Sequence, residues 1–134
     1  MSKKPELHPA LLRKINLVRS AMSAAGMPMV QAGSLGGVRT DEQQNTLYQI
    51  GRSRPGKIVT NADGKKVRSN HQVSDDGFGH AVDCAFLVND MITWEVPDSW
   101  WEAYGSLCKA VGLRWGIKIG DWIDRPHAEL PKTG

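Results

Sequence analysis

One acidic residue, Asp83, stands inside the otherwise apolar segment that runs from His80 to Val88. The length and composition of this segment are typical of a central β-strand. A carboxylate on a buried strand is costly unless it is paired with a cation or bound to a metal ion. The chain must therefore fold so that other segments bring a compensating group to Asp83.

Size and composition indicate a single domain over residues 1–134. A chain of this length, with 40% apolar and 23% charged residues, can bury a core and is too apolar for a disordered protein. The two cysteines form no disulfide framework, which fits synthesis in a reducing cytoplasm. No apolar run approaches the ~20 residues of a membrane span, so we expect no stable membrane insertion. The net charge of +3 favours anionic polymers without indicating a nucleic-acid partner.

Three segments carry helix signals. Apolar residues at helical spacing predict a helix over residues 9–25. Thr40 followed by Gln43 is a capping-box pattern, which predicts a second helix through Ile50. A third, amphipathic helix is expected to start at Asp98, with that residue as its cap.

Strands are expected around the central segment at residues 80–88. Three further short strand candidates occupy residues 28–34, 113–116 and 127–130. Residues 51–69 carry six Lys or Arg residues without periodicity, and a loop of this length is usually functional or disordered. The order of elements indicates an α+β fold with a small antiparallel sheet and flanking helices.

Two histidines accompany Asp83 as candidate ligands. His71 stands in a glycine-containing loop, and His127 follows Pro126, which fixes the backbone just before it. Two neutral imidazoles and one carboxylate are a typical catalytic zinc set that leaves a fourth position for water. The spacing alone is unspecific, since Asp83 could be a structural carboxylate and His71 an ordinary loop residue.

Three motifs occur in order along the chain: Ser69-x-His71, Gly79-His-Ala81-Val-Asp83 and Asp124-x-Pro-His127-x-Glu129. Together they resemble the LAS metallopeptidases, and more narrowly the D-alanyl-D-alanine peptidase (VanY-like) branch that contains phage L-alanyl-D-glutamate endolysins. The resemblance covers about residues 28–131. It implies a hedgehog/D-Ala-D-Ala-peptidase-like fold.

The resemblance also implies roles for individual residues. A zinc ion would be held by His71, Asp83 and His127, with Asp124 as general base. Zinc lowers the pKa of its water ligand toward ~7, and a carboxylate can pass the water's proton to the leaving amine. Arg39 would stabilise the oxyanion or hold a substrate carboxylate, unless it simply pairs with an acid on the surface.

The sequence leaves two assignments open, one metal ligand and the general base. The segment after His71 is five residues longer than in the short form of the family motif, which makes His80 a rival ligand. The odd spacing of His80 along the strand points it away from Asp83. Glu129 is a rival general base, because strand alternation puts it on the same face as His127.

The tryptophans divide into two groups by sequence context. We expect Trp101 and Trp115 in the core, and Trp94, Trp100 and Trp122 to be partly exposed. Tryptophan side chains can stack on sugars, although most tryptophans in proteins pack in a core.

The function implied by the resemblance is zinc-dependent hydrolysis of the L-alanyl-D-glutamate bond in the peptidoglycan stem peptide, by a phage endolysin that lyses the host wall. One alternative is a D-alanyl-D-alanine carboxypeptidase, which would need a pocket closed around the terminal carboxylate. Another is an inactive, zinc-bearing wall-binding module. We expect a monomer that is made in the host cytoplasm without a signal peptide. It would reach the wall, in the periplasm of a Gram-negative host, after a membrane lesion.

Overall fold

The helix α1 (Pro9–Ala24) forms over the segment in which apolar residues recur at helical spacing. In the computed structural model, which describes residues 5–132, His8 caps this helix: its Nδ1 accepts a hydrogen bond from the Ala10 backbone N–H at 3.0 Å. The predicted helix over residues 9–25 is confirmed. Its buried stripe consists of Leu11, Ile15, Val18 and Met22.

The strand β4 (Ala81–Val88) is the centre of a five-stranded antiparallel sheet. Its first half pairs with β9 (His127–Glu129), and its second half pairs with β2 (Met29–Gln31) and β5 (Met91–Thr93). The strand β6 (Arg114–Trp115) pairs with the other edge of β9. All four predicted strand segments therefore contribute to the sheet, and β5 is an addition that the sequence did not reveal.

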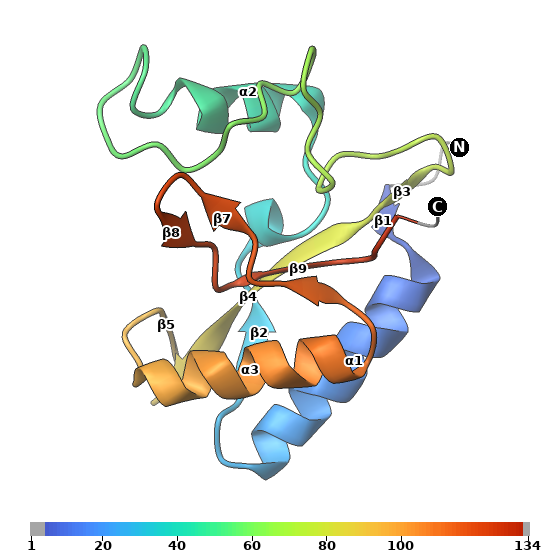
Figure 1. Ribbon diagram of the computed structural model, residues 1–134, viewed down its shortest axis with the longest axis vertical. Helices are drawn as coiled ribbons and strands as arrows, with labels where there is room; N and C mark the ends of the chain where they lie inside the picture. The colour runs from blue at the N-terminus through green and yellow to red at the C-terminus, as the bar shows by residue number, and fades with distance from the viewer. Residues whose placement is uncertain (1–4, 133–134) are drawn as a thin grey trace.

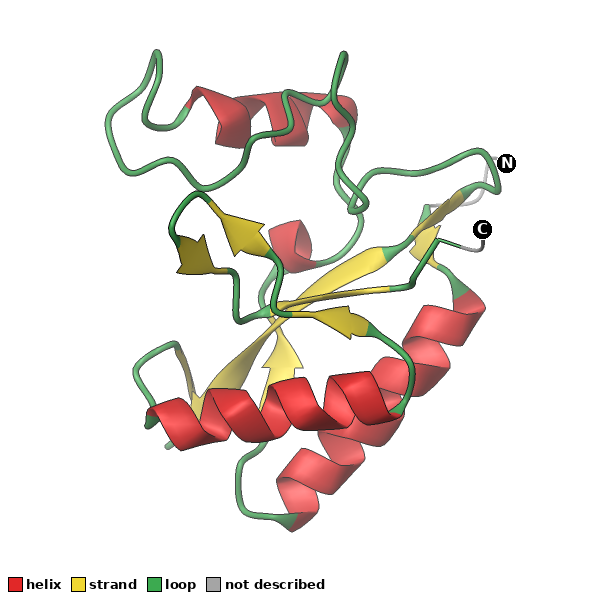
Figure 2. Ribbon diagram, viewed as in Figure 1, coloured by secondary structure: helices red, strands yellow, loops and turns green. Residues whose placement is uncertain are grey.

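Two helices, α1 and α3 (Asp98–Ala110), cover one face of this sheet, as Figure 1 and Figure 2 show. Strand alternation sends Val82 and Cys84 into the core beneath these helices, whereas Asp83 faces the opposite side. At Gly105 of α3 the contact is tight, because a Cβ atom there would lie 2.5 Å from the Trp115 ring. The buried core thus holds β4 in place on one face, and the candidate site lies on the opposite face, with Asp83.

The helix α3 begins at Asp98, but the prediction that Asp98 caps it is wrong. Pro97 takes the cap position, since its extended backbone (φ −55°, ψ 145°) precedes the first helical residue. Asp98 therefore lies within the first turn, where a negative charge is favourable. Its carboxylate accepts a hydrogen bond from Arg125 at 2.8 Å.

The helix α2 (Asp41–Gln49) and the loop over residues 51–69 lie across from the sheet, at the top of Figure 1. The predicted capping box is present: Thr40 Oγ1 accepts from the Gln43 N–H, and Gln43 Oε1 accepts from the Thr40 N–H. Residues 51–69 contain no helix or strand, as predicted. The short 3₁₀ turn η1 (Ser34–Gly36) joins β2 to this part of the chain.

Two pairs of very short strands complete the architecture. The strand β1 (Glu6–Leu7) pairs in parallel with β3 (Phe78–Gly79), and β7 (Lys118–Ile119) forms a hairpin with β8 (Trp122–Ile123). The predicted α+β class, with a small antiparallel sheet and flanking helices, is confirmed. Among the helices of residues 5–132, none has both the length and the apolar character that a membrane crossing requires.

Candidate metal centre

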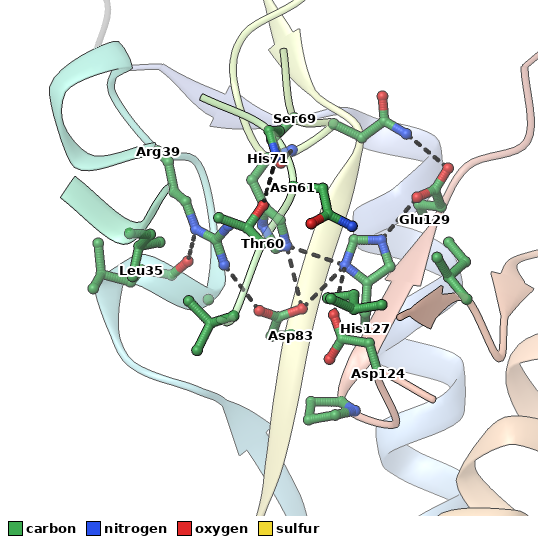
Figure 3. A pocket seen from close by; sticks show the side chains of 18 of the residues that line it. Leu35, Arg39, Thr60, Asn61, Ser69, His71, Asp83, Asp124, His127 and Glu129 are labelled. Carbon is green, nitrogen blue, oxygen red and sulfur yellow. Dashed lines mark hydrogen bonds and ion pairs between the residues drawn. The ribbon is translucent and has the colours of Figure 1, made fainter. Parts of the chain in front are cut away.

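The side chains of His71, Asp83 and His127 converge beside the sheet (Figure 3). His71 Nε2 lies 3.2 Å from Asp83 Oδ1 and 3.2 Å from His127 Nδ1. His127 Nδ1 in turn lies 3.3 Å from Asp83 Oδ1. The structure thus brings together, from a loop and two strands, the three residues that the sequence predicted as metal ligands.

Backbone pairing places these three side chains. Asp83 and His127 are cross-strand partners in the β4–β9 ladder, so both side chains leave the sheet on the same face. The turn that carries His71 is tied to the segment after η1 by a hydrogen bond from the Arg39 N–H to the His71 carbonyl oxygen, at 2.8 Å. The arrangement therefore depends on contacts between segments that are far apart in the sequence.

The outer ring nitrogens of both histidines face hydrogen-bond acceptors. His71 Nδ1 lies 2.9 Å from the Gly37 carbonyl oxygen, and His127 Nε2 lies 2.8 Å from Glu129 Oε1. Because such oxygens only accept, each outer nitrogen carries the hydrogen of the neutral imidazole. In the neutral form of each ring, the inner nitrogens, His71 Nε2 and His127 Nδ1, then keep a lone pair for a metal ion.

Three lone-pair donors at this spacing fit a small tetrahedral cation. Ligand atoms about 2.0–2.1 Å from a zinc ion lie about 3.3–3.4 Å from one another in tetrahedral geometry. The same surroundings attract protons: burial lowers the pKa of His127, but hydrogen bonds to Asp83 and Glu129 outweigh it and raise the pKa to about 9. The cluster therefore favours one positive charge, for which a proton and a metal ion compete.

Arg39 holds the second oxygen of Asp83. Its Nη2 donates to Asp83 Oδ2 at 3.0 Å, its Nη1 to Gln44 Oε1 at 3.0 Å, and its Nε to the Leu35 carbonyl oxygen at 2.7 Å. The Arg39 side chain is only 11% exposed, so it pairs with an acid inside the site and not on the surface. Among residues 5–132, three of its five N–H groups have an acceptor and the other two have none.

Two amide side chains, for which the sequence predicts no role, support the cluster. Gln44, which is fully buried, accepts from Arg39 and donates from Nε2 to the Ala62 carbonyl oxygen at 2.9 Å. Asn70 donates from Nδ2 to Glu129 Oε2 at 2.7 Å. The contacts of Gln44 with Ala62 and of Asn70 with Glu129 span 18 and 59 positions of the sequence, so no local pattern shows them.

Asp124 lies beside the cluster, with its Oδ2 4.0 Å from His127 Nδ1, and it lines a cleft. Burial and the charge of Asp83 raise the pKa of Asp124, which makes it a better proton acceptor. The rival base, Glu129, has both oxygens engaged, since Oε1 faces His127 and Oε2 also accepts from Arg114 at 3.1 Å.

His80, the rival metal ligand, lies outside the cluster. Its Nε2 lies 2.6 Å from Asp76 Oδ2, and the group that could hold a metal consists of the other three residues. This placement agrees with the odd spacing between His80 and Asp83 along the strand.

The cluster opens into a cleft of about 690 Å³, a volume in the range of small-molecule binding sites. The α2 side of the cleft contributes apolar residues such as Leu47 and Val59. The β7–β8 hairpin contributes Ile119 and Trp122, and Trp94 lines the cleft from the end of β5. The site is thus a polar centre in a cleft whose walls are largely apolar.

A family model of M15 peptidases, described as D-alanyl-D-alanine carboxypeptidase, matches residues 62–130, just over half of the chain. This match includes the whole His-Asp-His cluster. The chain belongs to this M15 peptidase family. The M15 assignment confirms the resemblance seen in the motifs.

Among known proteins, the chain is similar to the peptidoglycan L-alanyl-D-glutamate endopeptidase CwlK of Bacillus subtilis (strain 168). The two are 29% identical over 136 residues, which cover 93% of this chain and 74% of CwlK.

Two solved structures share the fold of this M15 peptidase. The L-Ala D-Glu endopeptidase ChiX of Serratia marcescens has a TM-score of 0.60 and 23% identity, over 94% of this chain and 81% of ChiX. The LdcB LD-carboxypeptidase has a TM-score of 0.64 and 20% identity, over 95% of this chain and 66% of LdcB. At these identities the likeness shows the fold alone, which is the peptidase fold that the motifs implied.

Proposed function

We propose that this M15 peptidase is a zinc-dependent endopeptidase that hydrolyses the L-alanyl-D-glutamate bond of the peptidoglycan stem peptide. The observation that carries the proposal is the His71–Asp83–His127 cluster, which lies in an open cleft with Asp124 beside it. The choice of bond is supported by CwlK and ChiX, which are L-alanyl-D-glutamate endopeptidases.

His71, Asp83 and His127 would hold the zinc ion in this proposal. Their inner atoms form a triangle with edges of 3.2–3.3 Å, which suits a small tetrahedral cation. When bound, zinc supplies Lewis acidity, which makes water more acidic and polarises a carbonyl oxygen. Glu129 and Gly37 keep the two imidazoles oriented through their outer nitrogens.

Asp124 would move the proton in this mechanism. Its carboxylate accepts a proton from the attacking water, whose oxygen bonds to the carbonyl carbon of the L-alanyl residue. The C–N bond then breaks, and Asp124 returns the proton to the leaving nitrogen of D-glutamate. Arg39 keeps Asp83 in place and has two N–H groups left to donate to an oxygen of the substrate.

As the biological role, we propose a phage endolysin that degrades the wall of its bacterial host and so contributes to lysis. The support is the set of sequence motifs, which resembles the endolysin branch of the family.

Mass spectrometry of purified peptidoglycan after incubation with the zinc-loaded protein tests the proposed activity. We expect stem peptides that begin with D-glutamate, together with glycan strands that keep L-alanine on the muramyl residue. Loss of one terminal alanine would instead identify a D-alanyl-D-alanine carboxypeptidase. The absence of any product with zinc bound would leave a wall-binding module.

A further inference from the structure

Two of the five tryptophans are half exposed, and both line the candidate cleft. Trp94 is 49% exposed and Trp122 is 46% exposed. Trp101 is buried, and Trp100 and Trp115 pack against the core. Isolated exposed apolar residues are ordinary on a protein surface, but two large aromatic rings in one cleft indicate a binding surface.

The two exposed rings are held by different elements. Trp94 follows β5, and its ring lies nearly parallel to the buried Trp101, with an angle of 10° and centroids 6.4 Å apart. Trp122 belongs to the β7–β8 hairpin, where it is the cross-strand partner of Ile119. The ring of Trp94 therefore lies beside the buried Trp101, and Trp122 belongs to a hairpin that forms part of the cleft wall.

The chemistry of the proposed substrate determines what such rings would meet. In peptidoglycan the L-alanyl residue is joined through a lactyl group to N-acetylmuramic acid. The sugar therefore begins about two extended units, roughly 7 Å, from the scissile carbonyl. A cleft of about 690 Å³ has room for more than the dipeptide around that bond.

We propose that Trp94 and Trp122 form a glycan subsite, which binds the muramyl sugar on the amino side of the scissile bond. This proposal rests on the proposed L-alanyl-D-glutamate activity. The C–H face of a pyranose ring is apolar and packs on an indole face, while the hydroxyl groups at its rim stay hydrated. The indole N–H of either residue can also donate to a sugar oxygen. The two rings would thus select a stem peptide that is still attached to its glycan strand.

The test compares two substrates that differ only in the sugar. One is a disaccharide-linked L-Ala-γ-D-Glu-diaminopimelate peptide, and the other is the same peptide with an N-acetyl cap. We expect kcat/KM of the zinc-loaded enzyme to be higher for the sugar-linked substrate, mainly through a lower KM. Stacking on each ring should contribute about three- to tenfold.

The variants Trp122→Ala and Trp94→Ala should lower kcat/KM far more for the sugar-linked substrate than for the N-acetyl peptide, so that the preference is lost. The N-acetyl peptide is therefore the internal control for folding. The variant Trp122→Phe keeps an aromatic face and should retain most of the preference. As a matched control, Met91→Ala removes a side chain that is 71% exposed and does not line the cleft, and it should change neither value.

Equal kcat/KM values for the two substrates with the unmodified enzyme would overturn the glycan subsite and leave the peptidase activity standing. An equal loss on both substrates in Trp122→Ala and Trp94→Ala would also overturn it. Cleavage of neither substrate would count against the proposed function instead. An NMR titration with N-acetylmuramyl-L-alanine then tests the subsite without catalysis: the indole N–H signals of Trp94 and Trp122 should shift, and unshifted signals would contradict binding.

Discussion

Glu129 accepts a hydrogen bond from His127 Nε2 at 2.8 Å, on the ring nitrogen opposite to the one that faces Asp83. The other carboxylate oxygen of Glu129 is held by Asn70 and Arg114. Glu129 is therefore placed to orient His127, which is the arrangement that metal-binding imidazoles use in proteins.

The variant Glu129→Ala tests this relationship. Without the carboxylate, His127 loses its orientation, and we expect zinc affinity to fall about 10- to 100-fold. Competition with a chromophoric chelator measures the affinity. The control Glu102→Ala removes an exposed carboxylate of α3 and should have no effect. Unchanged zinc affinity in Glu129→Ala would show that Glu129 does not orient His127 for metal binding.

The variant Asp124→Ala separates proton transfer from metal binding. Because Asp124 is not one of the three clustered residues, we expect the variant to keep the zinc content of the unmodified protein. Loss of the general base should lower kcat about 10²- to 10⁴-fold. The two readouts are metal analysis and muropeptide turnover on the same preparation. Full turnover in Asp124→Ala would move the role of base to Glu129.

The variant Gln44→Leu tests the buried link between α2 and Arg39. Leucine is similar in size, but it leaves the Arg39 Nη1–H and the Ala62 carbonyl oxygen without their partner. We expect the free energy of unfolding to drop by about 1–3 kcal/mol in urea titrations. The exposed residue Thr46 on the same helix provides the control Thr46→Ala. A loss no larger than in that control would show that the link contributes nothing.

The two buried cysteines predict a pH dependence. Burial raises the pKa of Cys84 from 9.0 to about 11, and that of Cys108 from 9.0 to about 12. Above pH 9 the unfolded chain releases these protons while the folded chain keeps them, so the free energy of unfolding should fall as pH rises from about 9 to 11. Urea titrations at pH 8 and pH 10 measure the fall.

The double variant Cys84→Ala/Cys108→Ala is the control for the cysteine prediction, and its stability should fall less between the two pH values. Iodoacetamide at pH 8 should leave both thiols unmodified in the folded protein and modify both in urea. Rapid modification of either thiol in the folded protein would contradict its burial.

The fold could be predicted where the chain carries a repeating pattern. The nine-residue apolar run around Asp83 predicted β4, and helical spacing with caps predicted α1 and α2. The hairpin of β7 and β8 could not be predicted, because two residues per strand are too few for an alternation. The cap of α3 was misassigned because Asp98 and the preceding proline both suit a helix start, and the backbone of Pro97 decides between them.

The residues of the site also divide into those that the sequence predicts and those that it does not. The clustering of His71, Asp83 and His127 could be predicted, since few residue types bind zinc and the motifs that contain them are specific. The roles of Gln44 and Asn70 could not be predicted, because amide side chains are common and the folded chain brings their partners Ala62 and Glu129 from distant positions. Long-range hydrogen bonding is therefore the part of the site that needs the structure.

If His71, Asp83 and His127 together hold one catalytic zinc ion, as we propose, the metal content of the protein must show it. The protein is incubated with zinc, separated from free metal and analysed by inductively coupled plasma mass spectrometry, beside the variant His71→Ala. We predict about one zinc ion per chain in the unmodified protein and a large loss in the variant. A zinc content near zero in the unmodified protein, or the same content in both, would rule out a zinc site at these three residues.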